Sequence, residues 1–401
     1  MNRILITLFT VISTLIQAQH QNILVKNDSI RKNPGYLYLG VNNLAFIKNN
    51  EYFNLIADGY TLIGNKLDLN AIWKPHRNYQ INIGFSTLKY AGRNDFEKSV
   101  PYIGLEINNR NSNFYIGKLY TNDNHLLPDE IYAFERHLDY RSIENGLQHR
   151  FKNAHWQTDT WLEWEDFIFK GDHLRERLNF GQSTIYTYQN KQWTLSIPLN
   201  IYLQHRGGQI NKRVVGQNTI NNAMVINNMS MGINLKRSIG VNKSIGISYA
   251  YLAHQINSDN TEELLFKSGY AHKWQLFFNY KYFNNYLGYW QGHQFVAPKG
   301  DDMFQSVSRR VEKFVDDQGK SIEVFKYHTE PNRRLLTWTT TYQKEIFNNL
   351  KLAFVLDLYY QLNHSSIQNS AYTSQVDHQF DYATGLYLLY KFDFKLLKVK
   401  F

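Results

Sequence analysis

The chain has 401 residues, of which 15% are aromatic, a formal net charge of +10 at pH 7 and no cysteine. The absence of cysteine excludes disulfides, thiolate metal sites, thiol nucleophiles and a lipid-modified N-terminal cysteine. Many Tyr, Phe, Ile and Asn with only 7 Pro favour strands over disorder, and the length fits two or three ordinary domains or one large β-barrel.

Residues 1–18 are predicted to form a secretory signal peptide. Arg3 precedes a mostly apolar core over 4–16, and the small residue Ala18 precedes a polar stretch. This core is shorter than the roughly 20 residues that a helix needs to span a bilayer. We therefore expect export with cleavage near Ala18, followed by a periplasmic leader over 19–34.

From Gly35 onward, apolar and polar residues alternate in runs of about 10 residues. In residues 193–203, for example, every odd position is apolar and the even positions include Ser196 and Asn200. A soluble β-sandwich also alternates in this way. The apolar positions, however, carry large side chains in nearly every run, with Tyr or Trp near the ends. This pattern is typical of a lipid-facing band edged by aromatic girdles.

The connections between these runs are unequal in length. Short links such as 189–191 and 240–242 alternate with long polar loops such as 205–221 and 293–332. Short turns on one side and long loops on the other predict an all-β fold, an antiparallel transmembrane β-barrel of about 16 strands (range roughly 14–18) that forms one domain over 35–401. The expected strands are 36–47, 65–73, 78–90, 100–108, 112–120, 138–151, 154–166, 174–188, 192–204, 222–237, 243–254, 270–282, 286–292, 333–345, 350–362 and 380–396.

The C-terminal run continues the alternation to the last residue. Up to Leu396 its apolar residues are predicted to face lipid, and the apolar phase then slips at Leu396–Leu397, which predicts a β-bulge or the membrane exit. With the signal end "IQAQ", the alternating strands and the terminal "KVKF", the chain resembles the outer-membrane β-barrel proteins of Gram-negative, Bacteroidetes-like bacteria. The resemblance implies an outer-membrane location, lipopolysaccharide as a neighbour, and Phe401 as the signal read by the barrel-assembly machinery.

Positions opposite the apolar face of each strand are expected to point into the lumen. Acidic and basic residues on neighbouring strands predict a charged constriction, with Glu163, Glu165, Arg175 and Arg177 as its main residues. The alternative hypothesis is that these charges pair across strands and hold the wall together. The full predicted pore lining is Glu144, Arg150, His155, Asp159, Glu163, Glu165, Arg175, Arg177, Lys273, Lys281, Asp357, Lys391 and Asp393.

The longest loop, 293–332, is predicted to act as a gate or binding loop. Its charged residues include Asp301, Asp302, Arg309 and Arg310, and residues 303–314 are expected to form a short helix. The adjacent carboxylates suit Ca²⁺, although such pairs are more often plain solvated charge. We therefore expect no metal site.

Signals for an enzyme are weak in this sequence. His364 lies beside Ser365 and Ser366, which loosely resembles outer-membrane lipases, but no third group that would orient the histidine is evident. No zinc-binding spacing and no phosphate-binding glycine loop is present, so no cofactor is expected.

The positive charge favours anionic or neutral saccharides as solutes and does not indicate nucleic acid in an exported protein. The sequence thus predicts a porin-like channel for passage or export of polar solutes, which is not an enzyme. A non-conducting barrel that binds surface polysaccharide or a protein partner through its loops is the alternative. A barrel lipid hydrolase is the third hypothesis.

Overall fold

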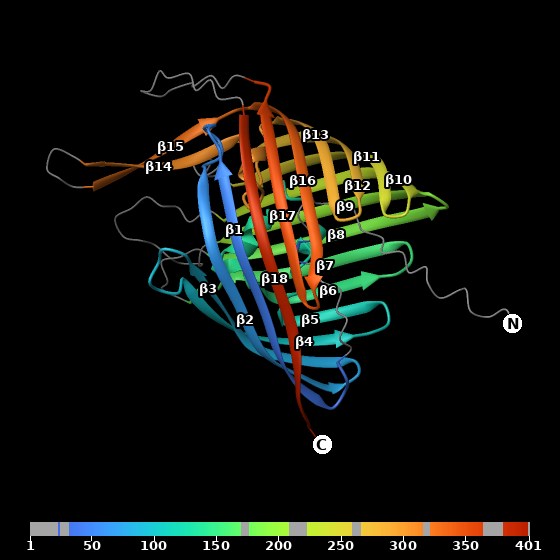
Figure 1. Cartoon of the computed structure of the whole chain (residues 1–401). Helices are drawn as coiled ribbons and strands as arrows, with labels where there is room; N and C mark the ends of the chain where they lie inside the picture. The colour runs from blue at the N-terminus through green and yellow to red at the C-terminus, as the bar shows by residue number, and fades with distance from the viewer. Residues whose placement is uncertain are drawn as a thin grey trace.

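The computed structural model describes residues 23–24, 32–169, 176–207, 223–258, 266–315, 321–363 and 380–399. Sixteen antiparallel strands form a closed barrel (Figure 1), which confirms the predicted fold class and strand number. Consecutive strands pair side by side, and β1 pairs with β18 to close the ring. The wall strands are β1 (Tyr36–Glu51), β2 (Tyr60–His76), β3 (Tyr79–Tyr90), β4 (Lys98–Asn108), β5 (Ser112–Lys118), β6 (Asn145–Lys152), β7 (Trp156–Asp166), β8 (Glu176–Asn190), β9 (Trp193–Gly207), β10 (Met224–Gly240), β11 (Lys243–Asn257), β12 (Ser268–Tyr280), β13 (Phe283–His293), β16 (Asn332–Phe347), β17 (Leu350–Gln361) and β18 (Phe380–Lys398).

The wall has an apolar outer face and a polar inner face. On β9, the Leu199 side chain is 48% exposed, whereas its neighbour Asn200, which faces the lumen, is 5% exposed. On β12, Leu276 is 57% exposed and Lys273 is 8% exposed. A continuous belt of exposed large apolar side chains requires a nonaqueous surrounding, which the hydrocarbon core of a membrane provides.

The seam between the first and last strands contains the bulge that the sequence predicts. Leu37 pairs with Leu397, and the next residue, Tyr38, pairs with Lys395. Leu396 is therefore the extra residue on β18, at the phase slip in the apolar pattern. Phe401, the predicted assembly signal, lies outside the described residues.

The two ends of the barrel differ. At the turn end, strands are joined by tight links such as residues 281–282 between β12 and β13. At the loop end, the connection between β13 and β16 carries the short helical turn η4 (Asp302–Phe304) and a separate hairpin of β14 (Val307–Val315) and β15 (Ser321–Thr329). The predicted helix over 303–314 is wrong, because most of this segment pairs with β15 and becomes a strand.

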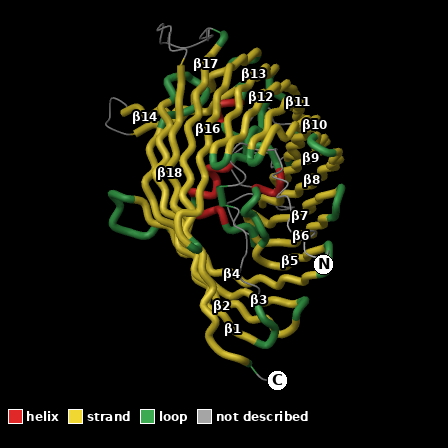
Figure 2. Tube along the Cα trace, turned by 45° about the vertical axis from the view of Figure 1, so that its right-hand side comes forward, coloured by secondary structure: helices red, strands yellow, loops and turns green. Residues whose placement is uncertain are grey.

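The connection between β5 and β6 enters the barrel. It contains three short helical turns, η1 (Asn124–Leu126), η2 (Phe134–Leu138) and η3 (Tyr140–Ser142), which lie inside the ring of strands (Figure 2). The predicted strand over 138–151 is thus wrong in its first half, since β6 begins only at Asn145. Among the described residues, no helix has the length and apolar character needed to cross a membrane.

Residues 119–144 and 294–306 together form an inner body that we call the plug. The two segments are bonded to each other, since the Ala133 N–H donates to the Lys299 carbonyl at 2.7 Å and the Asp301 N–H donates to the Asp129 carbonyl at 2.9 Å. Two apolar clusters pack the plug against opposite walls. One contains Leu127, Ile131, Phe295 and Phe304 with Trp161, Tyr202, Trp290 and Tyr359 of the wall, and the other contains Phe134 and Leu138 with Phe46, Leu88, Val355 and Tyr387. The plug therefore contacts the wall on both sides of the lumen.

Candidate functional site

A cluster of ion pairs fixes the plug to β6 and β7. His125 is fully buried, with Nε2 2.8 Å from Glu144 Oε2 and Nδ1 3.2 Å from Asp159 Oδ2. Arg136 donates to the other Glu144 oxygen, and Arg150 Nε lies 3.3 Å from Asp159 Oδ2. Because every buried charge has an opposite partner within reach, the cost of removing these groups from water is offset by pairing.

The sequence predicts that Glu144, Arg150 and Asp159 line an open lumen. All three lie inside the barrel. Glu144 belongs to the plug and pairs with His125 and Arg136 within it, whereas Arg150 and Asp159 of the wall pair with plug residues and hold the plug in place. Five other predicted lumen residues are also paired: Glu163 with Asn179 at 2.8 Å, Glu165 with Lys299 at 2.7 Å and with Arg177 at 3.4 Å, Lys273 with Glu130, and Asp357 with Thr339 at 2.6 Å. This arrangement agrees with the alternative hypothesis that the charges hold structure together.

Two predicted lumen residues lie elsewhere. Lys281 is exposed in the turn between β12 and β13, with a φ of 52°. His155 is exposed in the turn before β7, and its ring contacts the Thr187 carbonyl at 3.1 Å. Both residues are predicted to lie in the lumen because the alternation of apolar and polar residues continues one residue beyond the strand, before β7 for His155 and after β12 for Lys281. Arg175 and the side chains of Arg309 and Arg310 lie outside the described residues, as do the predicted signal peptide and the segment with His364, Ser365 and Ser366.

The His125 ion pairs predict a pH-dependent contribution to stability. Burial by itself lowers the pKa of His125, but the Glu144 and Asp159 carboxylates outweigh it and raise the pKa from 6.5 to about 9. Because the pKa of His125 is higher in the folded state, protonation of this residue stabilises the fold. The stabilisation is complete when the pH lies below the pKa of the unfolded state, and it is lost as the pH rises through about 9. We expect the free energy of unfolding of the wild type to exceed that of His125→Gln at pH 6 by on the order of 3 kcal/mol. Urea unfolding in detergent at pH 6, 8 and 10 measures this difference, which should shrink at pH 10; a constant difference contradicts the assignment.

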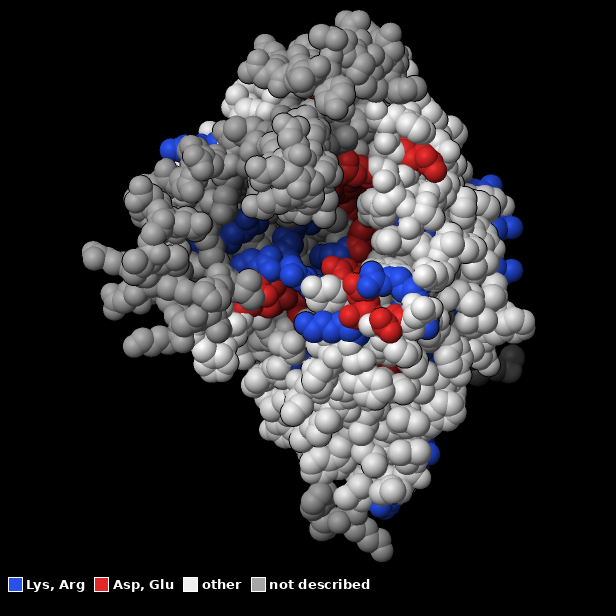
Figure 3. Space-filling model, turned by 90° about the vertical axis from the view of Figure 1, so that its left-hand side faces the viewer, with Lys and Arg blue, Asp and Glu red and all other residues white. Residues whose placement is uncertain are grey.

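A second feature of the lumen is a cavity of about 150 Å³ between the plug and the wall at the loop end. We call it the mouth cavity. Seen from the side on which β14 and β15 lie in Figure 1, the molecule is hollowed and both acidic and basic side chains gather there (Figure 3). The acidic residues that line the mouth cavity are Asp58, Asp129, Glu135, Asp301, Asp302 and Asp357.

The Glu135 carboxylate, from η2, is held at the floor of the mouth cavity by groups from β1. Lys48 Nζ lies 3.2 Å from Glu135 Oε1 and 3.9 Å from Asp357 Oδ2. Asn50 Nδ2 lies 3.1 and 3.3 Å from the two Glu135 oxygens. Lys48 and Asn50 are both buried, whereas the Glu135 side chain is 28% exposed. Buried Lys48 and Asn50 therefore hold the Glu135 carboxylate on its wall side, while the carboxylate stays partly exposed to the mouth cavity.

Asp301 and Asp302 lie on the plug side of the same cavity. Burial, and then the charge of Glu135, raises the pKa of Asp301 to about 8, and the same two causes raise the pKa of Asp302 to about 6. Asp301 Oδ1 also accepts a hydrogen bond from the Met303 N–H at 2.9 Å. At neutral pH the mouth cavity thus holds a protonated carboxyl group near the Lys48-paired Glu135. In such a pair, the protonated Asp301 can donate a proton and the Glu135 carboxylate can accept one.

The predictions found only part of this site. Asp301 and Asp302 were expected in a gate or binding loop, and they lie in the plug at its mouth. Lys48, Asn50 and Glu135 are not among the predicted site residues, because the first strand is expected to end at residue 47 and residues 121–137 fall between the expected strands 112–120 and 138–151. Among the described residues, no three His, Asp or Glu side chains are grouped closely enough to hold a metal ion.

The closed barrel, the apolar outer belt and the charged interior define an outer-membrane β-barrel protein, as predicted. More narrowly, the chain belongs to the lipid A 3'-O-deacylase-type family, whose model matches residues 28–399. This is an enzyme family, so the expectation that the protein is not an enzyme is wrong. No curated protein matches the sequence.

Several solved outer-membrane proteins have a similar fold. OmpT of Vibrio cholerae is 10% identical with a TM-score of 0.47, over 90% of this chain and 99% of that one. OccK5 (OpdH) of Pseudomonas aeruginosa is also 10% identical, with a TM-score of 0.45 over 90% of this chain and 99% of that one. Identities this low transfer no activity to the present chain.

Proposed function

We propose that this protein is an outer-membrane hydrolase that cleaves an acyl ester of a lipid A-type glycolipid, with the mouth cavity as its active site. The observation that carries the proposal is the family match over residues 28–399. The position of the mouth cavity supports it, because the loop end of such a barrel faces the outside, next to the glycolipid headgroups of the outer leaflet. Lipopolysaccharide, expected from the sequence as a neighbour, is then the substrate.

Ester hydrolysis adds water across the acyl carbon–oxygen bond and gives a carboxylic acid and an alcohol. Glu135 is suited to accept a proton from the attacking water, because Lys48 and Asn50 hold its carboxylate in one orientation. Asp301 is suited to donate a proton to the departing sugar oxygen, because its raised pKa keeps it protonated at neutral pH. Glu135 thus takes the proton that the water loses, and Asp301 supplies the proton that the sugar oxygen gains.

The predicted channel role has less support. A conducting porin needs a continuous aqueous path, and here the plug lies in the lumen and packs against opposite walls. The charged residues expected to screen solutes are instead paired with the plug or with one another.

The test is an assay of lipid A mass. Purified protein refolded in detergent is incubated with lipopolysaccharide, and the lipid A is analysed by mass spectrometry. We expect the loss of one acyl chain, at a rate that falls as the pH rises through about 8, because Asp301 must be protonated. In Asp301→Asn, the rate should be low at every pH. An unchanged lipid A mass, with protein that migrates as a folded barrel before heating and as an unfolded chain after it, contradicts the proposal.

A further inference from the structure

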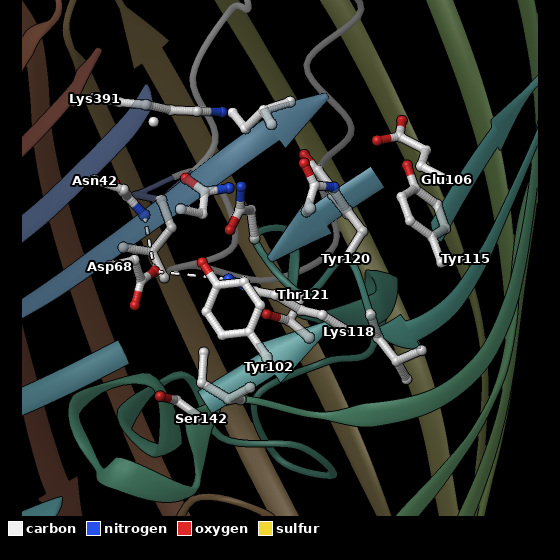
Figure 4. Close-up of a pocket in the computed structure, with 18 of the residues that line it drawn as sticks. Asn42, Asp68, Tyr102, Glu106, Tyr115, Lys118, Tyr120, Thr121, Ser142 and Lys391 are labelled. Carbon is white, nitrogen blue, oxygen red and sulfur yellow. Dashed lines mark hydrogen bonds and ion pairs between the residues drawn. The ribbon is translucent and has the colours of Figure 1, made fainter. Parts of the chain in front are cut away.

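A larger cavity, of about 430 Å³, lies on the turn side of the plug and is not used by the proposed reaction. We call it the chamber (Figure 4). The two cavities lie at different heights along strand β1. Gly40, Val41, Asn42 and Leu44 line the chamber, whereas Lys48 and Asn50 line the mouth cavity nearer the loop end. Helical turn η2 separates the two, with Glu135 facing the mouth cavity and His137 facing the chamber.

Four polar side-chain atoms of the chamber lining lack a hydrogen-bond partner in the part of the chain that the structure describes. Two belong to charged groups with ion-pair partners, Asp68 Oδ1 and Arg150 Nε. The two neutral ones are the Tyr102 hydroxyl, from β4, and Asn42 Oδ1, from β1. Tyr102 is 4% exposed, and in Figure 4 the Asn42 and Tyr102 side chains come from different sides and point toward the region around Asp68. A buried polar atom without a partner costs about 1–3 kcal/mol, so two such atoms facing one cavity suit a bound molecule with hydroxyl groups.

The chamber also holds two lysines, Lys118 and Lys66, with N–H donors that make no hydrogen bond to any described residue. Lys118 Nζ lies 3.7 Å from the centre of the Tyr102 ring and 3.9 Å from Asp68 Oδ2, which is too far for a hydrogen bond. Lys66 uses one donor on the Ser142 hydroxyl, and an ammonium group has three. Five basic and three acidic side chains line the chamber, so its electrostatic preference is for an anion.

We propose that the chamber binds a small hydroxylated anion, a sugar phosphate or a sugar acid, independently of deacylation. The anionic group lies against Lys118 and Lys66, and the sugar hydroxyls bond to Asn42 Oδ1 and to Tyr102. The volume falls in the range of about 300–1,000 Å³ that is usual for small-molecule sites.

Isothermal titration calorimetry of the refolded full chain tests this proposal with three probes: glucose 1-phosphate, gluconate and uncharged glucose. We expect at least one anion to bind, with glucose at least about tenfold weaker. Lys118→Met should weaken anion binding at least about tenfold, and Tyr102→Phe, which keeps the ring, roughly threefold to tenfold. Lys281→Met, which removes an exposed lysine of a turn, should bind like the wild type.

Whichever anion binds identifies the preferred group, phosphate or carboxylate. The proposal is overturned if neither anion gives heat, if glucose binds as tightly, or if both Lys118→Met and Tyr102→Phe bind unchanged. Should Lys118→Met fail to fold, Tyr102→Phe decides alone. Because the readout is heat and not acyl release, failure here is distinct from failure of the proposed hydrolase.

Discussion

Replacing Glu135 with Gln is expected to slow acyl release from lipopolysaccharide by at least about 100-fold, the usual contribution of a general base. The amide keeps the shape of the side chain but cannot take a proton from water. The variant also leaves the Lys48 ammonium with only the Asp357 carboxylate, 3.9 Å away, as an ion-pair partner among the described residues. The rate is measured by mass spectrometry of lipid A at pH 7.

The matched control is Glu97→Gln, which makes the same chemical change in the β3–β4 connection. Glu97 pairs with Arg93 at 3.3 Å and does not line the mouth cavity, so its activity should equal that of the wild type. Equal rates for Glu135→Gln and the wild type exclude Glu135 as the base. A folded barrel in all three samples, seen as heat-modifiable migration, separates loss of chemistry from loss of structure.

The barrel could be predicted because its wall obeys a simple rule. Every second side chain of a wall strand faces lipid, so residues such as Leu199 and Leu276 are apolar while their neighbours are not. The same rule located the bulge at Leu396, where the phase slips. The alternating pattern therefore indicates contact with the membrane. It predicted a strand correctly in almost every segment that has such contact.

The plug could not be predicted by that rule, because it touches no lipid. Its backbone is irregular: Asn124, His125 and Leu126 all have φ between 53° and 61°, a left-handed conformation that side chains other than glycine rarely adopt. Three such residues in succession persist only where surrounding contacts impose them, and His125 is held between two carboxylates of distant segments. Those contacts exist only in the folded barrel, so the sequence around residues 124–126 contains no pattern that predicts them.

The same limit explains the missed site residues. Glu135 lies in a segment whose polar composition predicts an outer loop, and only its position inside the barrel places it against Lys48. Lys48 lies one residue beyond the expected end of the first strand, although β1 continues to Glu51. This candidate site forms where the plug meets the wall. It can be recognised only when the plug residue and the wall residue are both placed.

Removing the plug segment between β5 and β6 is expected to turn a closed barrel into a conducting one. Lys118 and Asn145 pair directly at the ends of the two strands, so residues 119–144 can be replaced by a short Gly-Ser turn without moving the wall. Barrels of about 16 strands leave an aqueous channel when nothing fills them. In planar lipid bilayers, we expect no conductance steps from the wild type and clear steps from the shortened variant.

The control is a variant in which residues 91–97, the connection between β3 and β4, are shortened in the same way. That connection lies at the loop end and contributes nothing to either apolar cluster of the plug, so this variant should stay closed. Steps from the wild type as large as those from the plug variant contradict a filled lumen. A folded but silent plug variant shows instead that residues 294–306, which bury Phe295 and Met303 against the opposite wall, close the barrel without help from η1–η3.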